Sequence, residues 1–544
     1  MTMRSRVFAR LFALSAALLS LASTVALPSA TAEDGLAGGL PLPLGPAGLA
    51  EQRTSMELAP GLVLTRINRG NPDPASGWTV TAAWEETESA AQATAARVTA
   101  AGFTPTVLRV DQRAPDDPAS GPLGYAVRVG TFATLEAATP LRGELVAAGF
   151  SGAGVDFTGE DGGATSGPWS IDVLRVEHAR FGAALRSALP NQQIAAGKSR
   201  LSQIVTREAA LAGVNGGYFV VGPTDGTPGD AAGIAVHDGA LVSEAVNGRT
   251  ALFLEHGTRP DAPLARVLSS VSTSIQVTAS DSSQHVVNGL DRVPGLERAC
   301  GVPGAMPTEL PKHDFTCTDP NELILYRPIY GTATPAGEGV EAALSADGRV
   351  GVLRPRGGRI PLDGAVLAGS GVAADWLAAH AQPGARLRVT ERLATEAGRV
   401  QLESGLDVVN GGPRLLRDGQ PQITACAEGF CYGETGRFYW RFGVRRNPRT
   451  MAGTTDVKSR VARVGWAGPH QERRSRADPH QQTRVPERGS AGLRCERFGA
   501  KPSCTSSISR PGHRIRHWSI TFGARKRTAR ARSFPSPACI VRSW

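Results

Sequence analysis

The stretch Gly213-Val-Asn-Gly-Gly-Tyr-Phe219 is the strongest local signal in this 544-residue chain, and Val409-Asn-Gly-Gly-Pro413 repeats its centre. A Gly-Gly pair after a β-type run lets the backbone turn with positive φ and lets a ligand approach closely. The asparagine ahead of each pair can hydrogen-bond a polar substrate. Asn-Gly is also a common hairpin signal, which is the simplest interpretation of either copy alone. Two such turns in one domain indicate one shared pocket.

Other segments extend this pattern along the chain. They are Gly233-Ile-Ala-Val-His-Asp-Gly239, Asn288–Arg292, Asn321–Tyr326, Tyr330-Gly-Thr332, Leu415–Gly419 and Arg446-Asn-Pro-Arg-Thr-Met-Ala-Gly453. In order and spacing the set resembles the phosphodiester glycosidase family, the bacterial relatives of the lysosomal mannose-6-phosphate uncovering enzyme (N-acetylglucosamine-1-phosphodiester alpha-N-acetylglucosaminidase). The resemblance covers residues 167–455.

The resemblance implies hydrolysis of the glycosidic bond of a sugar 1-phosphodiester, which releases the sugar and leaves a phosphomonoester. An arginine such as Arg449 can stabilise the charge that develops on such a leaving group. Thr450 and the backbone N–H groups after each Asn-Gly-Gly asparagine can add hydrogen-bond donors. We therefore predict four catalytic residues, Asn215, Asn410, Arg449 and Thr450, and five substrate-binding residues, Gly216, Gly217, Tyr218, Gly411 and Gly412. We expect no metal and no cofactor.

Glycosidic cleavage ordinarily also uses one or two carboxylates near the anomeric carbon. Glu403 and Asp407 precede the second Gly-Gly turn and are the nearest candidates, although solvated charges are the simpler interpretation of both. In the resembling family the domain continues to an Asn-Leu-Asp-Gly-Gly-Gly-Ser segment, which this sequence lacks. Two hypotheses therefore stay open: an active glycosidase, or a catalytically inactive wall-binding protein that has lost the C-terminal part of the domain.

Positive charge is concentrated at the C-terminal end. Residues 456–544 contain 20 Lys+Arg and 5 Asp+Glu, whereas the whole chain has a net charge of +10. A basic tail often binds nucleic acid, but this one has no helix or strand periodicity and is rich in Arg, Ser and Pro. We predict a disordered tail and no nucleic-acid partner. Our hypothesis is that the tail is translated in the wrong reading frame.

The N-terminus has the features of an export signal. Arg4, Arg6 and Arg10 precede the apolar run Leu11–Leu21, and Ala30-Thr-Ala32 is a small-residue cleavage site. We predict a signal peptide over residues 1–32 and a secreted, cell-wall-associated protein with no membrane span after signal cleavage; an uncleaved anchor is the alternative. Residues 33–76 are predicted to be a linker and N-terminal segment.

A repeat organises the next part of the chain. The segment from Trp78-Thr-Val80 to Ala101-Gly-Phe103 recurs from Tyr125-Ala-Val127 to Ala148-Gly-Phe150, 47 residues later. Each copy has a short alternating strand, an alanine-rich helix, a Gly-Phe turn and a second strand. This pattern predicts a βαβ-βαβ domain over residues 77–158, with its helices on one face of the sheet.

Within the second copy, Tyr125-Ala-Val-Arg-Val-Gly-Thr-Phe132 resembles the signature of SPOR domains, which bind peptidoglycan glycan strands stripped of stem peptides. By strand alternation, Val127 and Val129 face the core. The opposite, open face then carries the residues that we predict to bind glycan, Thr79, Thr81 and Arg128. The alternative is that this face of the sheet is an ordinary solvent-exposed surface that binds no ligand.

Cysteine usage agrees with export. Four cysteines precede residue 456, in pairs close in sequence, which suits two local disulfides in an oxidising compartment: Cys300 with Cys317, and Cys426 with Cys431. Free buried thiols are the alternative. A zinc site is not favoured, because the spacing lacks a C-x₂-C pair and no histidine cluster accompanies it.

After a linker at residues 159–167, residues 168–455 contain many short strand-like runs and few helices. That mixture favours an α+β domain over a doubly wound sheet. The fold class that we predict is therefore α+β: a small SPOR-like βαβ-βαβ domain, a larger glycosidase-like domain and a disordered basic tail. The expected partners are peptidoglycan glycan strands and a sugar phosphodiester substrate.

Overall fold

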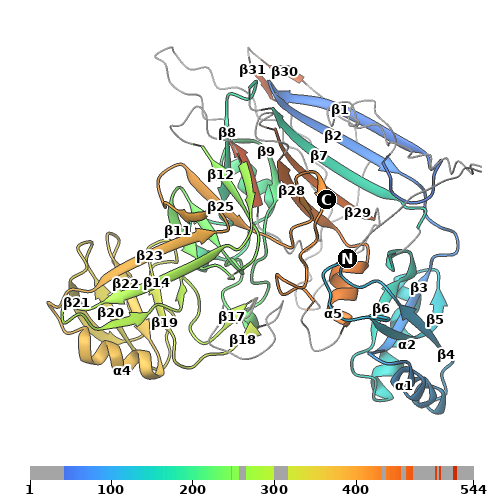
Figure 1. The fold of residues 1–544 in the computed structure, drawn as a ribbon, viewed down its shortest axis with the longest axis horizontal. Coiled ribbons are helices and arrows are strands. Elements are labelled where there is room, and N and C mark those ends of the chain that lie inside the picture. Colours follow the sequence, from blue (N-terminus) through green and yellow to red (C-terminus); the bar gives the residue numbers. More distant parts are fainter. Residues whose placement is uncertain are drawn as a thin grey trace, which may run out of the picture. The chain divides into compact units, whose positions relative to one another are not determined.

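The computed structural model of the chain describes residues 42–162, 165–177, 179–246, 248–256, 265–298, 316–431 and 436–454, together with four strands between residues 461 and 523. The predicted signal peptide lies outside the described residues. So do Cys300 and the side chain of Cys317, which we expected to form a disulfide. The described chain is mixed α+β, as predicted (Figure 1).

The SPOR-like domain has the predicted βαβ-βαβ order. Its elements are β3 (Trp78–Glu85), α1 (Glu88–Ala100), β4 (Pro105–Val110), β5 (Gly124–Phe132), α2 (Leu135–Ala147) and β6 (Gly154–Phe157). The strands form one sheet in the order β4-β5-β3-β6. Thr87 and Thr134 cap the two helices by accepting the backbone N–H groups of Ala90 and Ala137. Val98 of α1 and Leu145 of α2 pack with Val127 of β5 in the domain core.

The larger domain begins before the SPOR-like domain and resumes after it. β1 (Glu51–Ala59) pairs with β2 (Leu62–Arg69), and β2 pairs with β7 (Trp169–Glu177). Arg69 at the end of β2 lies opposite Trp169 at the start of β7. The chain thus leaves and re-enters one sheet at neighbouring positions, so the SPOR-like domain is an insertion into the larger domain.

Five sheets make up most of the larger domain. The first has the order β1-β2-β7-β29-β28, with β28 at Arg449–Thr454 and β29 at Val461–Pro469. The second is β11 (Ala240–Ser243), β10 (Ala235–His237), β25 (Leu406–Asn410), β12 (Ala251–Glu255) and β13 (Ala265–Leu268). The third is β15 (Gln284–Val286), β14 (Ser272–Thr278), β23 (Arg388–Thr395) and β24 (Gly398–Val400).

The fourth sheet is β16 (Gly289–Leu290), β19 (Leu323–Tyr326), β22 (Ala365–Gly369), β20 (Val340–Leu344) and β21 (Val350–Pro355). The fifth is β8 (Ala184–Ala188), β32 (Ser519–Gly523) and β9 (Ala210–Asn215). Two-stranded pairs are β17 (Glu297–Arg298) with β18 (Thr316–Cys317), β26 (Leu416–Arg417) with β27 (Gln420–Pro421), and β30 (Glu496–Phe498) with β31 (Lys501–Ser503).

Helices are short in the larger domain. They are α3 (Leu201–Arg207), α4 (Gly371–His380), α5 (Arg437–Tyr439), which continues into the π-helical turn η4 (Trp440–Val444), and the 3₁₀ turns η1 (Thr158–Glu160), η2 (Ile194–Ala196) and η3 (Pro223–Asp225). Figure 1 shows α5 close to β6 of the SPOR-like domain, which agrees with a hydrogen bond from Arg437 to the backbone oxygen of Gly152.

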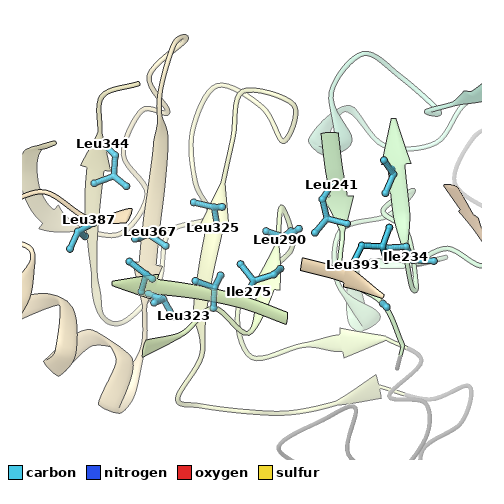
Figure 2. Close-up of a cluster of buried hydrophobic side chains, with 14 of the residues drawn as sticks. Ile234, Leu241, Ile275, Leu290, Leu323, Leu325, Leu344, Leu367, Leu387 and Leu393 are labelled. Carbon is cyan, nitrogen blue, oxygen red and sulfur yellow. The ribbon is translucent and has the colours of Figure 1, made fainter. Parts of the chain in front are cut away.

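The main core joins the second, third and fourth sheets. Figure 2 shows Leu241 of β11, Ile275 of β14, Leu325 of β19 and Leu367 of β22 in one buried cluster. Alternation explains this arrangement, because each strand directs every second side chain to the same face. Val408 of β25, which leads into the second Asn-Gly-Gly turn, belongs to this cluster, whereas Val214 of β9, which leads into the first turn, packs in a separate cluster.

Four of the strands, β29 to β32, lie in the tail that we predicted to be disordered. β29 pairs with β7 and β28, and β32 pairs with β8 and β9. The structure therefore includes two short tail segments in sheets of the larger domain. The rest of the tail lies outside the described residues.

Candidate functional site

The two Asn-Gly-Gly turns lie against each other. Asn410, at the end of β25, accepts the backbone N–H of Tyr218 at its Oδ1 atom (2.6 Å) and donates from Nδ2 to the Tyr218 carbonyl (3.2 Å). The Tyr218 hydroxyl donates to the Gly412 carbonyl (2.7 Å). The Asn410 side chain is thus fully engaged in joining the turns, which makes it a positioning residue in this structure.

Glycine is required at this contact. A Cβ atom on Gly217 would lie 2.2 Å from both the backbone oxygen and Oδ1 of Asn410. Gly412 has φ +115°, and a Cβ there would lie 2.7 Å from Glu428 Oε2. The close approach of the two turns therefore explains the glycine at position 217, whereas positive φ and the nearby Glu428 side chain explain the glycine at position 412.

Glu428 holds the second Asn-Gly-Gly turn in place through hydrogen bonds. Its carboxylate accepts the backbone N–H groups of Arg414 and Thr250 (both 2.8 Å) and the Thr250 hydroxyl (2.8 Å), and its side chain is buried. These hydrogen bonds make Glu428 a structural carboxylate that positions the second turn. No sequence motif surrounds Glu428, so this role could not be predicted from the sequence.

Aromatic rings cover one side of the turns. Phe430 and Phe442 stack with their centroids 5.0 Å apart, and Phe442 stacks on Phe438 at 5.5 Å. The Tyr218 ring lies 5.8 Å from Phe430 and 6.3 Å from Phe442. The Arg249 guanidinium lies 4.4 Å from the Phe430 centroid. The three phenylalanines and Arg249 were also missed, because they come from three separate segments of the chain.

The predicted Cys426–Cys431 disulfide is present in the loop that carries Glu428 and Phe430. Asp116 of the SPOR-like domain accepts the backbone N–H of Ala427 in the same loop (3.0 Å). Asp116 and the two sulfurs have metal-ligand spacing, but the sulfurs are bonded to each other and cannot act as thiolate ligands. The loop is therefore held by the disulfide and by the inserted domain.

Arg449 reaches this aromatic cluster from β28. Its guanidinium lies 5.0 Å from the Phe442 centroid and donates to the Arg445 carbonyl (3.3 Å). Within the described residues no carboxylate forms an ion pair with it. Burial lowers the pKa of Arg449, while the nearby Tyr218 and Tyr439 hydroxyls oppose that shift. Among the described residues, therefore, no carboxylate neutralises this half-buried cation beside the first turn.

The other predicted residues flank this contact. Asn215 ends β9, is buried and makes no side-chain hydrogen bond to the described residues. Thr450 follows Arg449 in β28, with its backbone paired to Trp466 of β29. Gly216 and Gly411 complete the turns and are half-buried. The structure therefore brings Tyr218, Asn410 and Arg449 into one region, with Asn215 at its edge.

The two nominated carboxylates differ in surroundings. Glu403 is exposed, as expected for a solvated charge. Asp407 is fully buried and accepts the backbone N–H groups of Ser187 and Asp238 and His256 Nε2. Burial acts to raise the pKa of Asp407, but these hydrogen bonds and the neighbouring histidines outweigh it, and the pKa lies below its usual value. The interpretation of Asp407 as a solvated charge is wrong, and its role here is to fix neighbouring backbone.

Two further buried carboxylates have raised pKa values. Burial, with Glu244 and Asp291 nearby, raises the pKa of Asp230 well above its usual value. Burial raises the pKa of Asp291 to about 7. Asp230 adjoins the first turn, since its carbonyl accepts the N–H of Val220 (2.9 Å) and Ala232 donates to the Tyr218 carbonyl (3.0 Å). Asp291 lies in the Asn288–Arg292 segment noted in the sequence, but the raised pKa values of Asp230 and Asp291 could not be predicted, because they depend on burial.

The predicted glycan-binding residues lie opposite the core of the SPOR-like sheet, but that face is not open. Thr79, Thr81 and Arg128 are all buried. Thr81 donates to Asp156 (2.7 Å), and Arg128 forms a bidentate pair with Asp161 (2.6 and 2.7 Å). Alternation predicted the correct face, but the prediction that it is accessible is wrong, because residues 437–446 of the larger domain cover it.

Comparisons with known proteins agree with this architecture. Residues 74–155 match the family model of the SPOR domain. A crystal structure of a protein from Burkholderia pseudomallei K96243, described as exported, is 33% identical, with a TM-score of 0.72 over 80% of this chain and 87% of that one. A hypothetical protein from Synechocystis is 14% identical, with a TM-score of 0.41 over 78% of this chain and 69% of its own.

Among curated proteins, none matches the chain. No described helix has both the length and the apolar composition needed to cross a membrane.

Proposed function

The chain belongs to the family of the exported Burkholderia pseudomallei protein, and from this premise we propose a function for its two domains. We propose a protein of the cell envelope that binds peptidoglycan glycan strands through its SPOR domain. Its larger domain hydrolyses the glycosidic bond of a sugar 1-phosphodiester at the Asn-Gly-Gly turns. The first part rests on the SPOR match, because SPOR domains bind peptidoglycan.

The observation that carries the second part is the environment of Arg449. A half-buried guanidinium with no carboxylate partner in the described structure favours an anionic ligand, because burial without a counter-charge is unfavourable. Arginine binds phosphate oxygens in a bidentate manner. The ring of Tyr218 offers an apolar surface for a sugar ring, since Phe442 is already stacked with Phe430 and Phe438.

The proposed reaction requires stabilisation of the charge on the leaving group and an acceptor for one proton. Water adds to the anomeric carbon, the bond from that carbon to the phosphate oxygen breaks, and the phosphate keeps the bonding electrons. Because the phosphomonoester leaves as a stable anion, it needs charge stabilisation from Arg449 more than it needs a proton. The attacking water gives up one proton, and we assign its acceptance to the ionised form of Asp230, which has a backbone contact to the first turn and whose raised pKa makes it a stronger base than an ordinary carboxylate.

A catalytically inactive wall-binding protein is the second candidate. One observation favours it: the buried carboxylates Glu428 and Asp407 are both engaged by backbone donors, so neither is free to act on substrate. The two candidates predict different outcomes with the same substrate, namely turnover or binding alone.

The test uses the full chain and the methyl phosphodiester of N-acetylglucosamine 1-phosphate, with release of free sugar as the readout. Wild type should release sugar, and Arg449→Ala should lower the rate by about 10²–10³-fold, as for the loss of a transition-state charge stabiliser. Arg399→Ala, at an exposed position in β24, is the matched control. Binding without turnover in wild type would favour the inactive candidate, and unchanged turnover by Arg449→Ala would refute the assigned site.

A further inference from the structure

The covered face of the SPOR sheet is packed against an aromatic side chain from the larger domain. Trp440 of η4 is completely buried and stacks on Trp84 of β3, with centroids 4.9 Å apart and an interplanar angle of 21°. The guanidinium groups of Arg128 and Arg445 lie 5.6 and 5.3 Å from the Trp440 centroid. Trp440 thus occupies the place that a flat ligand would take on Trp84.

Charged groups close the same face. Arg445 forms ion pairs with Asp156 of β6 and, at 3.3 Å, with Glu160, and its Nη2 donates to the Phe157 carbonyl (3.1 Å). Asp156 is also the acceptor of the Thr81 hydroxyl. The polar groups that we predicted to bind glycan are therefore occupied by residues of the same chain.

Some hydrogen-bond donors between residues 437–446 and the SPOR sheet have no acceptor among the described residues. These donors are four buried N–H groups: Trp84 Nε1, Arg128 Nε, Trp440 Nε1 and Arg445 Nε. A buried donor without an acceptor destabilises the state that contains it. A glycan strand carries many hydroxyl acceptors and sugar rings with apolar faces, so it can stack on Trp84 and supply acceptors to Trp84 and Arg128.

The covering segment also forms part of the Arg449 site. Phe438 and Phe442 lie in the same residues 437–446 as Trp440 and Arg445, and Arg449 donates to the Arg445 carbonyl. Movement of this segment away from the SPOR sheet would therefore also move one wall of the Arg449 site.

We infer that residues 437–446 and a peptidoglycan glycan strand compete for one face of the SPOR sheet, so that glycan binding releases the segment and alters the Arg449 site. This inference rests on the proposed glycan binding. It adds that the full chain binds glycan more weakly than a SPOR domain with an uncovered sheet would. The reason is that residues 437–446 must first leave the sheet.

The test compares full-length variants by co-sedimentation with sacculi that an amidase has stripped of stem peptides. Trp440→Ala removes the stacked ring, and Arg445→Gln removes the ion pairs while keeping a polar side chain of similar length. Both should bind at least tenfold more tightly than wild type. Arg97→Ala, on the exposed side of α1, is the control and should bind as wild type does.

Each outcome has a defined meaning, given circular dichroism spectra that show folded variants. Equal binding by wild type and both variants would overturn the competition while leaving glycan binding intact. Absence of binding in all forms would reject the proposed glycan binding, and the competition with it. For a variant that fails to fold, limited proteolysis of wild type replaces binding: saturating stripped sacculi should increase cleavage within residues 437–446, and unchanged cleavage would overturn the inference.

Discussion

Two arginines of one segment, Arg445 and Arg449, have opposite environments. Arg445 is buried against the SPOR sheet, where Asp156 and Glu160 neutralise it. Arg449, four residues later, contacts the Phe442 ring and a backbone carbonyl, and within the described structure it has no acidic partner. The first holds two domains together, whereas the second is available to an anionic ligand.

The difference shows how the surroundings of a charge determine its role. A buried ion pair contributes little net stability, but removal of one partner is costly, because the other charge is left unpaired in a region of low polarity. A cation without a partner leaves no such residual charge when it is removed. Replacing each arginine in turn should therefore separate an effect on stability from an effect on ligand binding.

The largest effect on stability is expected for Arg445→Ala. The change removes the nearest cation of the buried Asp156, which keeps Arg441 at 3.7 Å, and one partner of the buried Glu160, so the free energy of unfolding should fall by up to about 3–5 kcal/mol. Urea denaturation measures this. Arg109→Ala, which removes an exposed pair with Asp111, should change little. Equal stability of Arg445→Ala and wild type would mean that the two domains are not held by this contact.

Asp291 extends the comparison to a buried carboxylate. The hydrogen bond and positive charge of Arg327 do not offset the effect of burial on its pKa. Its pKa of about 7 means that the folded protein retains a proton that the unfolded chain loses near pH 4. Its contribution to stability is therefore greatest below pH 4 and is lost as the pH rises to 7. Asp291→Asn should raise the free energy of unfolding at pH 8 by up to about 4 kcal/mol.

The same variant should change little at pH 4, where the wild-type carboxyl is protonated in the folded state and about half protonated in the unfolded state. Urea denaturation at the two pH values makes the comparison within one pair of proteins. Asp363→Asn is the control, because that carboxylate is exposed and has no ion-pair partner among the described residues. A gain for Asp291→Asn that is the same at pH 4 and pH 8 would contradict the raised pKa.

The smallest effect on stability is expected for Arg449→Gln. No described carboxylate loses its partner, so the free energy of unfolding should change by less than about 1 kcal/mol. N-acetylglucosamine 1-phosphate should raise the melting temperature of wild type but not of the variant. Arg446→Gln, which removes hydrogen bonds to Thr165 and Pro168, should destabilise the protein without removing this ligand response. An equal ligand response in wild type and Arg449→Gln would place anion binding elsewhere.

The sequence predicted those structural features that depend on residues close together in the chain. The Asp238-Gly239 and Asp418-Gly419 pairs form hairpin turns, which Asp-Gly pairs favour, with positive φ at all four residues. The repeat between Trp78 and Phe150 gave the order of strands and helices, because alternation and helical periodicity depend on neighbouring residues. The two Gly-Gly turns were predicted to share one pocket, and in the structure Asn410 and Tyr218 join them directly.

Only the tertiary structure decided what each face and each charge contacts. Alternation placed Thr81 and Arg128 opposite the core, but a segment some three hundred residues away covers them. The sequence shows Arg445 and Arg449 as equivalent cations, and it shows Asp407 as one more acidic residue near a turn. Their roles differ because burial and the nearest opposite charge come from distant segments, and electrostatic energies depend on those distances rather than on position along the chain.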